Sequence, residues 1–139
     1  MAKIVFTNGC FDILHVGHLR YLKDARELGD KLIVGLNSDS SIKKLKGDLR
    51  PIVPEDERRE MLLGLKSVDE VVIFSEETPF NLINLIKPNV LVKGGDWPVD
   101  KIVGSDIVLA NGGEVLSLPF HEGKSTTGTI ERILSVYRD

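Results

Sequence analysis

Five short apolar runs, each followed by a stretch of helical spacing, constrain the fold of this chain most strongly. The runs are residues 4–6, 31–36, 71–74, 90–92 and 115–118. Their Val, Ile and Leu content is typical of strands that are buried on both faces of a sheet. Strands that alternate with amphipathic helices form a parallel sheet with right-handed crossovers. The sequence therefore predicts an α/β fold, in which one doubly wound, parallel, five-stranded sheet carries helices on both faces.

Caps and helix-breaking residues mark the intervening helices. Gly29 ends the first helical pattern, Pro54 opens another that has acidic residues in its first turn, and Thr78-Pro79 opens a third. A further helix is expected over residues 105–111. Ser125 caps a last helix, whose apolar side holds Ile130, Ile133, Leu134 and Tyr137.

Size and composition limit the classes of function. A length of 139 residues is enough for one domain with a single core, so residues 1–139 are expected to fold as a unit. The net charge of −3 argues against nucleic acid or an anionic membrane as the main partner. Cys10 is the only cysteine, which excludes an internal disulfide and a cysteine zinc site. There is no signal-peptide pattern and no apolar run near the ~20 residues that a membrane span needs, so a cytoplasmic location is expected.

Residues 7–18, Thr-Asn-Gly-Cys-Phe-Asp-Ile-Leu-His-Val-Gly-His, join the first strand to the first helix. A helix N-terminus presents unpaired N–H groups and a partial positive charge, so it binds anions such as phosphate. His15 and His18 stand three residues apart and add donors on one side of this turn. Metal ligation is disfavoured, because no further ligand stands at a zinc-site spacing. Capping or core packing of the histidines is the remaining alternative.

Ligands of Rossmann-like sheets bind beyond the carboxyl ends of the strands, where the winding direction reverses. If the first and fourth strands are neighbours there, the His15 turn and the turn at 93–97 converge on one crevice. Trp97 in that turn either stacks on a ligand or belongs to the core or a lid. A solvated face is the ordinary interpretation of Lys43, Lys44 and Lys46. Lys46 is the best candidate among them for the crevice, because Gly47 allows a bend.

Two further segments have both a functional and an ordinary interpretation. Arg58 and Arg59 either belong to a site or, as their ordinary interpretation, lie at exposed positions of a helix. Ser125-Thr126-Thr127 either forms a second phosphate-binding helix N-terminus or is an ordinary N-cap. The preceding Gly123-Lys124 does not complete a P-loop, because Leu118 stands where that loop needs a glycine.

Taken together, His15-Val16-Gly17-His18 and Ser125-Thr126-Thr127 resemble the H-x-G-H and S-T-T signatures of the nucleotidylyltransferase superfamily. A similarity to one branch, the adenylyltransferase half of bacterial ADP-heptose synthases, extends along the whole chain through segments such as 6–9, 37–39, 45–47, 50–51, 92–96 and 111–114. The resemblance implies transfer of AMP from ATP to D-glycero-β-D-manno-heptose 1-phosphate, with Mg²⁺ accompanying the ATP, by a homodimer. Cytidylyltransferases of the glycerol 3-phosphate type, flavin-nucleotide-forming members and a nucleotide-binding module without turnover remain as alternatives.

The resemblance also assigns roles to residues. It implies that His15, His18 and Lys46 are catalytic, because they would hold the triphosphate and offset charge at the α-phosphoryl group. The implied nucleotide-binding residues are Asn8, Gly9, Cys10, Phe11, Gly17, Lys93, Gly94, Asp96, Trp97, Ser125, Thr126 and Thr127. The implied substrate-binding residues are Asp12, Asn37, Asp39 and Arg58. No residue is implied as a metal ligand.

Overall fold

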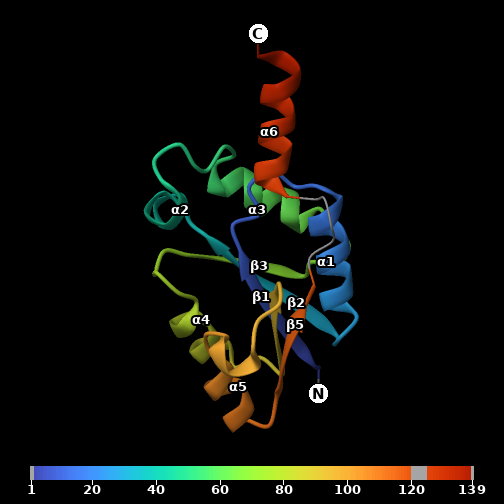
Figure 1. Ribbon diagram of the computed structural model, residues 1–139. Coiled ribbons are helices and arrows are strands. Elements are labelled where there is room, and N and C mark those ends of the chain that lie inside the picture. The colour runs from blue at the N-terminus through green and yellow to red at the C-terminus, as the bar shows by residue number, and fades with distance from the viewer. Residues whose placement is uncertain (1, 120–124, 139) are drawn as a thin grey trace.

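The five apolar runs form one parallel sheet in the computed structural model of the protein, which describes residues 2–119 and 125–138. The order of the strands in space is β3-β2-β1-β4-β5, and every neighbouring pair is parallel (Figure 1). The predicted five-stranded parallel sheet is therefore confirmed. The strands are β1 (Ile4–Gly9), β2 (Lys31–Asn37), β3 (Glu70–Phe74), β4 (Val90–Gly94) and β5 (Glu114–Leu118).

The helices lie between the strands, close to their predicted positions. Helix α3 begins one residue later than the proline pattern suggested, because Pro54 is the N-cap and Glu55 the first helical residue. The same shift applies to Pro79 at the start of α4. The helices are α1 (Val16–Arg26), α2 (Asp39–Lys46), α3 (Glu55–Leu63), α4 (Phe80–Ile86), α5 (Ser105–Ala110) and α6 (Thr126–Tyr137), with a 3₁₀ turn η1 (Val99–Lys101) before α5.

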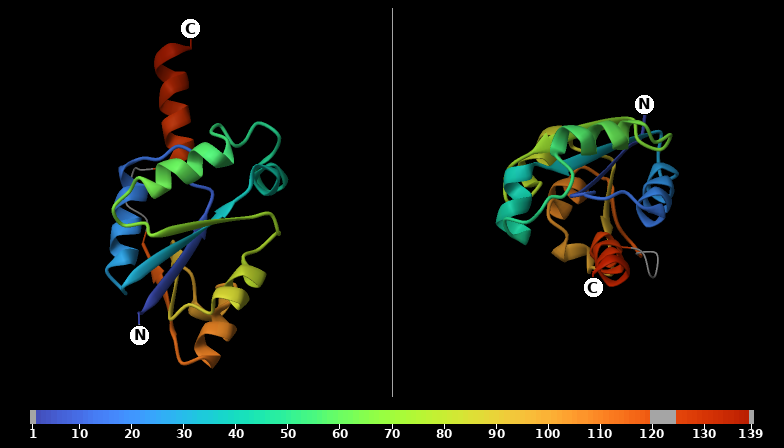
Figure 2. Two further views of the ribbon diagram at one scale, coloured as in Figure 1. Left: turned by 180° about the vertical axis from the view of Figure 1, so that it is seen from behind. Right: turned by 90° about the horizontal axis from the view of Figure 1, so that it is seen from above.

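Two apolar cores cover the two faces of the sheet, which confirms the doubly wound arrangement. Helices α1 and α3 pack on one face, where Leu22 and Leu62 are fully buried. Helices α4 and α5 pack on the other face through Ile83 and Val108. Figure 2 shows α1 and the pair α4 and α5 on opposite sides of the sheet. Strand residues alternate between the cores, since Val5 belongs to the first and Phe6 to the second.

The winding direction reverses between β1 and β4. From β1 the chain proceeds through β2 to β3 on one side, then crosses to β4 and β5 on the other. The first and fourth strands are therefore neighbours, as the converging-turn hypothesis required, and Val5 and Phe6 pair with Val90 and Leu91. Crevices at such a reversal are where open α/β sheets bind ligands.

Helix α6 departs from the expectation that amphipathic helices cover the sheet. Its bounds and its Ser125 cap are as predicted, but none of its residues is buried. The helix projects away from the sheet, with the C-terminus at its far end (Figure 1). Ile133, Leu134 and Tyr137, on its predicted apolar side, are all exposed. Thr126 Oγ1 donates to Ile13 O at 3.4 Å, so α6 is held by its first turn.

Within the described residues, the structure contains no helix that is both long and apolar enough to cross a bilayer.

Candidate active site

The turn after β1 is built around Phe11. Phe11 has φ of +46°, a left-handed conformation that is unusual for a bulky residue and is found mainly at tight functional turns. Gly9 makes room for its ring, because a Cβ at residue 9 would lie 2.9 Å from Phe11 Cε2. The ring then meets His18 edge to face, with centroids 5.3 Å apart. The strained turn therefore supports the second histidine from the side of the core.

His15 and His18 form a reciprocal cap at the N-terminus of α1. His15 is the N-cap, and its Nδ1 accepts from Gly17 N at 3.1 Å. His18 Nδ1 accepts from His15 N at 3.3 Å, and the two rings stack with centroids 3.9 Å apart. An acceptor Nδ1 carries no proton, so in each ring the proton resides on Nε2. The cap thus fixes both tautomers as Nε2–H donors.

His18 is neutral at physiological pH. Burial, the neighbouring His15 and the Lys46 ammonium together lower its pKa from 6.5 to about 4. Burial is the largest of these causes, since it disfavours the charged imidazolium. The influence of Lys46 shows that its ammonium lies near the histidine pair. His18 can therefore donate a hydrogen bond to a phosphate without carrying a charge of its own.

Cys10 is placed among cations, yet its thiol stays protonated. Burial raises its pKa above the usual 9.0, although Lys46, Arg58 and Arg50 act in the opposite direction. A protonated thiol is a poor nucleophile. The same influences indicate that the charges of Lys46 and Arg50 act on the turn after β1.

Lys46 owes its position to the end of α2. Gly47, the C-cap, has φ of +96° and ψ of 170°, a region that is essentially restricted to glycine. Its N–H donates to Lys43 O at 2.9 Å and ends the helix. The predicted bend at Gly47 is therefore present.

The N-terminus of α6 meets the turn that carries the histidines. Ser125 Oγ accepts from Gly128 N at 2.8 Å, which is the ordinary capping bond. Thr126 Oγ1 donates to Ile13 O, and Arg50 Nη2 donates to Thr127 Oγ1 at 3.3 Å. Two helix N-termini, each carrying one of the predicted signatures, are thus brought together although they are more than 100 residues apart in the sequence. Gly123 and Lys124 lie outside the described residues.

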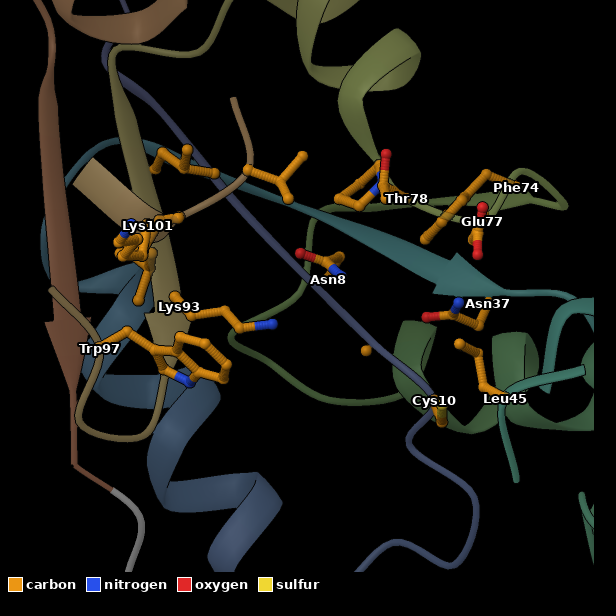
Figure 3. A pocket seen from close by; sticks show the side chains of 16 residues that line it. Asn8, Cys10, Asn37, Leu45, Phe74, Glu77, Thr78, Lys93, Trp97 and Lys101 are labelled. Atoms are coloured by element: carbon orange, nitrogen blue, oxygen red, sulfur yellow. The ribbon is translucent and has the colours of Figure 1, made fainter. Parts of the chain in front are cut away.

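A cavity of about 330 Å³ opens beside these turns at the carboxyl ends of the strands (Figure 3). Of the predicted site residues, Asn8, Gly9, Cys10, Asn37, Lys93 and Trp97 line it. His15, His18 and Asp96 are not among its lining residues. Lys93 Nζ lies 5.3 Å from the centroid of the Trp97 ring, at a distance where a cation is attracted to the ring face. Trp97 is 48% exposed, so the interpretation of it as a core residue is wrong.

The expectation that Arg58 is exposed is also wrong, because only 1% of its surface is accessible. Its Nη1 donates to Cys10 O and Asn37 O, each at 2.8 Å. Its Nε donates to Val53 O and its Nη2 to Asp39 Oδ1, again at 2.8 Å. These four bonds occupy most of the guanidinium's five N–H groups. Arg58 therefore braces the turns after β1 and β2, and this accounts for its burial.

Asp12 has a similar bracing role. It is buried, and its two carboxylate oxygens accept from Ile52 N at 3.0 and 2.9 Å. Oδ1 also accepts from Val53 N at 2.9 Å. Asp12 consequently ties the segment before α3 to the histidine turn, and it lines a separate apolar hollow with Phe11 and Met61.

Three polar or charged residues that line the cavity were not predicted as site residues. Glu77 and Thr78 lie in the connection from β3 to α4, and Lys101 lies in η1 after β4. Position alone could have indicated them, since each follows the carboxyl end of a strand near the winding reversal.

In the part of the chain that the structure describes, no group of three or more His, Cys, Asp or Glu side chains is arranged to hold a metal ion.

The fold and the paired helix N-termini at its winding reversal are those of a nucleotidyltransferase domain. The chain belongs to the Cytidylyltransferase-like family, whose sequence pattern it matches over residues 6–117. It is 61% identical over 137 residues to the Bifunctional protein HldE of Campylobacter concisus, covering 99% of this chain and 28% of that protein. It is 62% identical over 131 residues to the Bifunctional protein HldE of Aliarcobacter butzleri, covering 94% of this chain and 27% of that protein. The chain thus spans little more than a quarter of the length of these relatives.

Solved structures agree with the fold. A lipopolysaccharide core biosynthesis protein from Thermoplasma volcanium is 28% identical, with a TM-score of 0.69 over 89% of this chain and all of that one. The pantothenate synthetase of Thermus thermophilus is 18% identical, with a TM-score of 0.55 over 84% of this chain and 55% of that one, and shows the fold alone.

Proposed function

We propose that the chain transfers the adenylyl group of ATP to D-glycero-β-D-manno-heptose 1-phosphate, giving ADP-heptose and pyrophosphate for lipopolysaccharide core synthesis. The observation that carries this proposal is the hydrogen bond from Thr126 to Ile13, which joins the two signature-bearing helix N-termini beside the cavity. The similarity to HldE proteins along almost the whole chain supports the heptose branch. The Thermoplasma protein, named for lipopolysaccharide core biosynthesis, supports the same assignment.

In the proposed reaction a phosphate oxygen of the sugar attacks the α-phosphorus of ATP. The bond from the α-phosphorus to the bridging oxygen breaks, and pyrophosphate leaves with the electron pair. A phosphate monoester with a second pKa near ~6 is largely dianionic at neutral pH, so no protein nucleophile is needed. The protonated Cys10 thiol is compatible with that. The chain's contribution is alignment and charge stabilisation.

The proposed roles of the residues are those that the family resemblance implies, and the positions described above are compatible with them. Nε2–H of His15 and of His18 donates to the α-phosphoryl oxygens, and Lys46 offsets charge between the two substrates. The N-terminus of α6, with Ser125, Thr126 and the nearby Arg50, receives the β- and γ-phosphates. Trp97 and Lys93 flank the base. Mg²⁺ would accompany ATP as part of the substrate and would offset the charge of the phosphates; none of the described residues is assigned to hold it.

The alternatives differ in nucleotide and acceptor. Adenine and cytosine present different hydrogen-bonding edges, so a pocket that pairs one leaves polar groups unpaired with the other. We expect pyrophosphate release with Mg²⁺, ATP and heptose 1-phosphate, and much weaker release with CTP or with glycerol 3-phosphate. Preference for CTP with glycerol 3-phosphate, or for flavin mononucleotide, would replace the assignment by another member of the family. Nucleotide binding without any turnover would favour a non-catalytic module.

We also propose that the protein is a homodimer, in which the exposed apolar side of α6 packs against a second copy. An isolated helix of about 12 residues is marginally stable in water. Helix α6 has 12 residues and buries none of them within one chain, so a second copy would supply the packing that stabilises it.

A further inference from the structure

We infer that Glu77, together with Thr78, selects the acceptor by binding hydroxyl groups of the sugar. The inference rests on the proposed function and deepens it, because it names the residues that recognise the uncharged part of the acceptor. Both residues lie in the connection between β3 and α4, which forms one wall of the cavity.

Charge is the first argument. Glu77 is the only carboxylate among the 16 residues that line the cavity, and two lysines, Lys93 and Lys101, line it as well. A carboxylate repels phosphate, so in a cavity for phosphorylated ligands it suits the part of a ligand that bears no charge. In a sugar 1-phosphate that part is the ring and its hydroxyl-bearing tail.

Position is the second argument. Figure 3 shows Glu77 and Thr78 across the cavity from Trp97, Lys93 and Lys101, with Asn8 between the two groups. Because the base is proposed to lie beside Trp97, the wall with Glu77 faces the acceptor.

Unused hydrogen-bonding capacity is the third argument. Within the described residues Glu77 has no hydrogen bond or ion pair, so both carboxylate oxygens remain as acceptors. Thr78 Oγ1 accepts from Phe80 N at 3.4 Å, which leaves its own O–H as a donor. A sugar hydroxyl both donates and accepts, so one hydroxyl can donate to Glu77 and accept from Thr78. The pair is therefore matched to a polyol.

The test compares steady-state pyrophosphate release by wild type, Glu77→Ala and Glu77→Gln, with Glu76→Gln as the matched control. Glu76 is the adjacent carboxylate and is exposed, as Glu77 is, but it does not line the cavity. For Glu77→Ala we expect kcat/KM for heptose 1-phosphate to fall by ~10–100-fold, the range for losing a hydrogen bond to a charged group, with KM for ATP within about twofold of wild type. Glu76→Gln should match wild type, and melting temperatures should be unchanged.

A second arm tests the charge of Glu77. The acceptor is the same sugar 1-phosphate carrying another phosphate on its last carbon. Wild type should use this second acceptor poorly, because Glu77 repels its additional phosphate. In Glu77→Gln that repulsion is absent, so the preference for the first acceptor over the second, measured as the ratio of their kcat/KM values, should fall by about tenfold. An unchanged ratio would overturn the inference.

The outcomes separate this inference from the proposed function. A wild-type enzyme without activity towards ATP and heptose 1-phosphate removes the proposed function itself. An active wild type with unaltered acceptor kinetics in Glu77→Ala overturns only the role of Glu77. A rise in KM for ATP alone would place Glu77 beside the base, and this also overturns the inference.

Discussion

At the scale of single residues, His15 combines two properties that sequence reasoning had treated as alternatives. It caps α1 through Nδ1, and the phosphate contact proposed for it uses Nε2. The ordinary capping interpretation is therefore correct, and it does not compete with the functional one. The cap itself orients the ring and chooses its tautomer.

Substitution of His15 should separate capping from catalysis. Asn is a good N-cap, so the free energy of unfolding of His15→Asn, measured in urea, is expected to lie within about 0.5 kcal/mol of the wild-type value. The free energy of unfolding of His15→Ala should be lower than that of wild type by about 1 kcal/mol. Both variants should lose ~10²–10³-fold in kcat, the scale for removing one preorganised donor to a transition state. Near-normal turnover of His15→Asn would show that His15 acts only as a cap.

His18 should make stability depend on pH. Its pKa is about 4 in the folded protein, against 6.5 for an unperturbed histidine. Between these values the unfolded chain binds a proton that the folded protein does not, so the contribution of His18 is complete above pH 6.5 and declines as the pH falls towards 4. After discounting for solvent screening of a partly buried ring, the loss is about 1–2 kcal/mol.

The measurement is urea unfolding of wild type and His18→Asn at several pH values. Asn at this third helical position can still accept from the His15 N–H, so the variant keeps the cap while it loses the titrating group. As the pH is lowered from 7 to 4.5, the unfolding free energy of wild type should fall by more than that of His18→Asn. A difference that stays constant over that range would contradict the assignment.

At the scale of elements, the end of α2 determines where Lys46 lies. Gly47→Ala is expected to cost about 1–3 kcal/mol, because its backbone region is closed to residues with a Cβ. No atom stands within 4 Å of the added Cβ, so the cost is conformational and not steric crowding. Relief of that strain should move Lys46, and kcat should fall together with stability. Lys46→Ala should lower kcat at an unchanged melting temperature.

Gly112→Ala is the matched control. Gly112 also has a positive φ, of +77°, and no neighbour within 4 Å of an added Cβ, but it lies in the turn before β5, at the opposite end of the strands. It should lose stability like Gly47→Ala and keep its kcat. If Gly47→Ala and Gly112→Ala have the same kcat, the bend at Gly47 does not position Lys46 for the reaction.

At the scale of the whole molecule, most of the fold could be predicted from the sequence. Apolar runs and caps identify strands and helices because burial and capping are local requirements, and the H-x-G-H turn falls where the first strand meets the first helix. The hypothesis that the turns at His15 and Trp97 converge was conditional on strand order, which periodicity does not encode. The structure supplies that order by placing β1 beside β4. Cys10, at the start of the first turn, lines one cavity with Trp97, whereas His15 does not.

The error at Arg58 has a physical origin that also explains the burial of Asp12. Arg58 follows acidic residues in a polar helical pattern, so its sequence neighbours favour solvent exposure. Its burial depends on Val53 O, just before α3, and on Cys10 O, Asn37 O and Asp39, which belong to distant turns. Asp12 likewise owes its burial to backbone N–H groups some 40 residues away. Partners contributed by backbone leave no signature in a sequence. The cavity wall at Glu77 is a different case, because it depends on how the connection after β3 lies in space, and no motif in the sequence marks that connection.

Helix α6 is the element through which a second copy of the chain is proposed to bind. Ile133 is 50% exposed and Tyr137 82%, on a helix whose first turn belongs to the proposed phosphate site. A second copy that covers this side would stabilise the helix and, through it, the N-terminus that carries Ser125. Assembly and activity should then be coupled.

We expect sedimentation velocity to show a dimer of the wild type at micromolar concentration, and Ile133→Glu to shift it to monomer. An ionised carboxylate buried at the interface should weaken association by ~10²-fold or more. Leu85→Glu on α4 is the control, since Leu85 is 81% exposed and this substitution also replaces an exposed aliphatic side chain by a carboxylate. It should remain a dimer with normal kcat, while Ile133→Glu should lose activity in proportion to the monomer formed. A monomeric wild type would remove the homodimer, and a dimer that survives Ile133→Glu would exclude α6 as its interface.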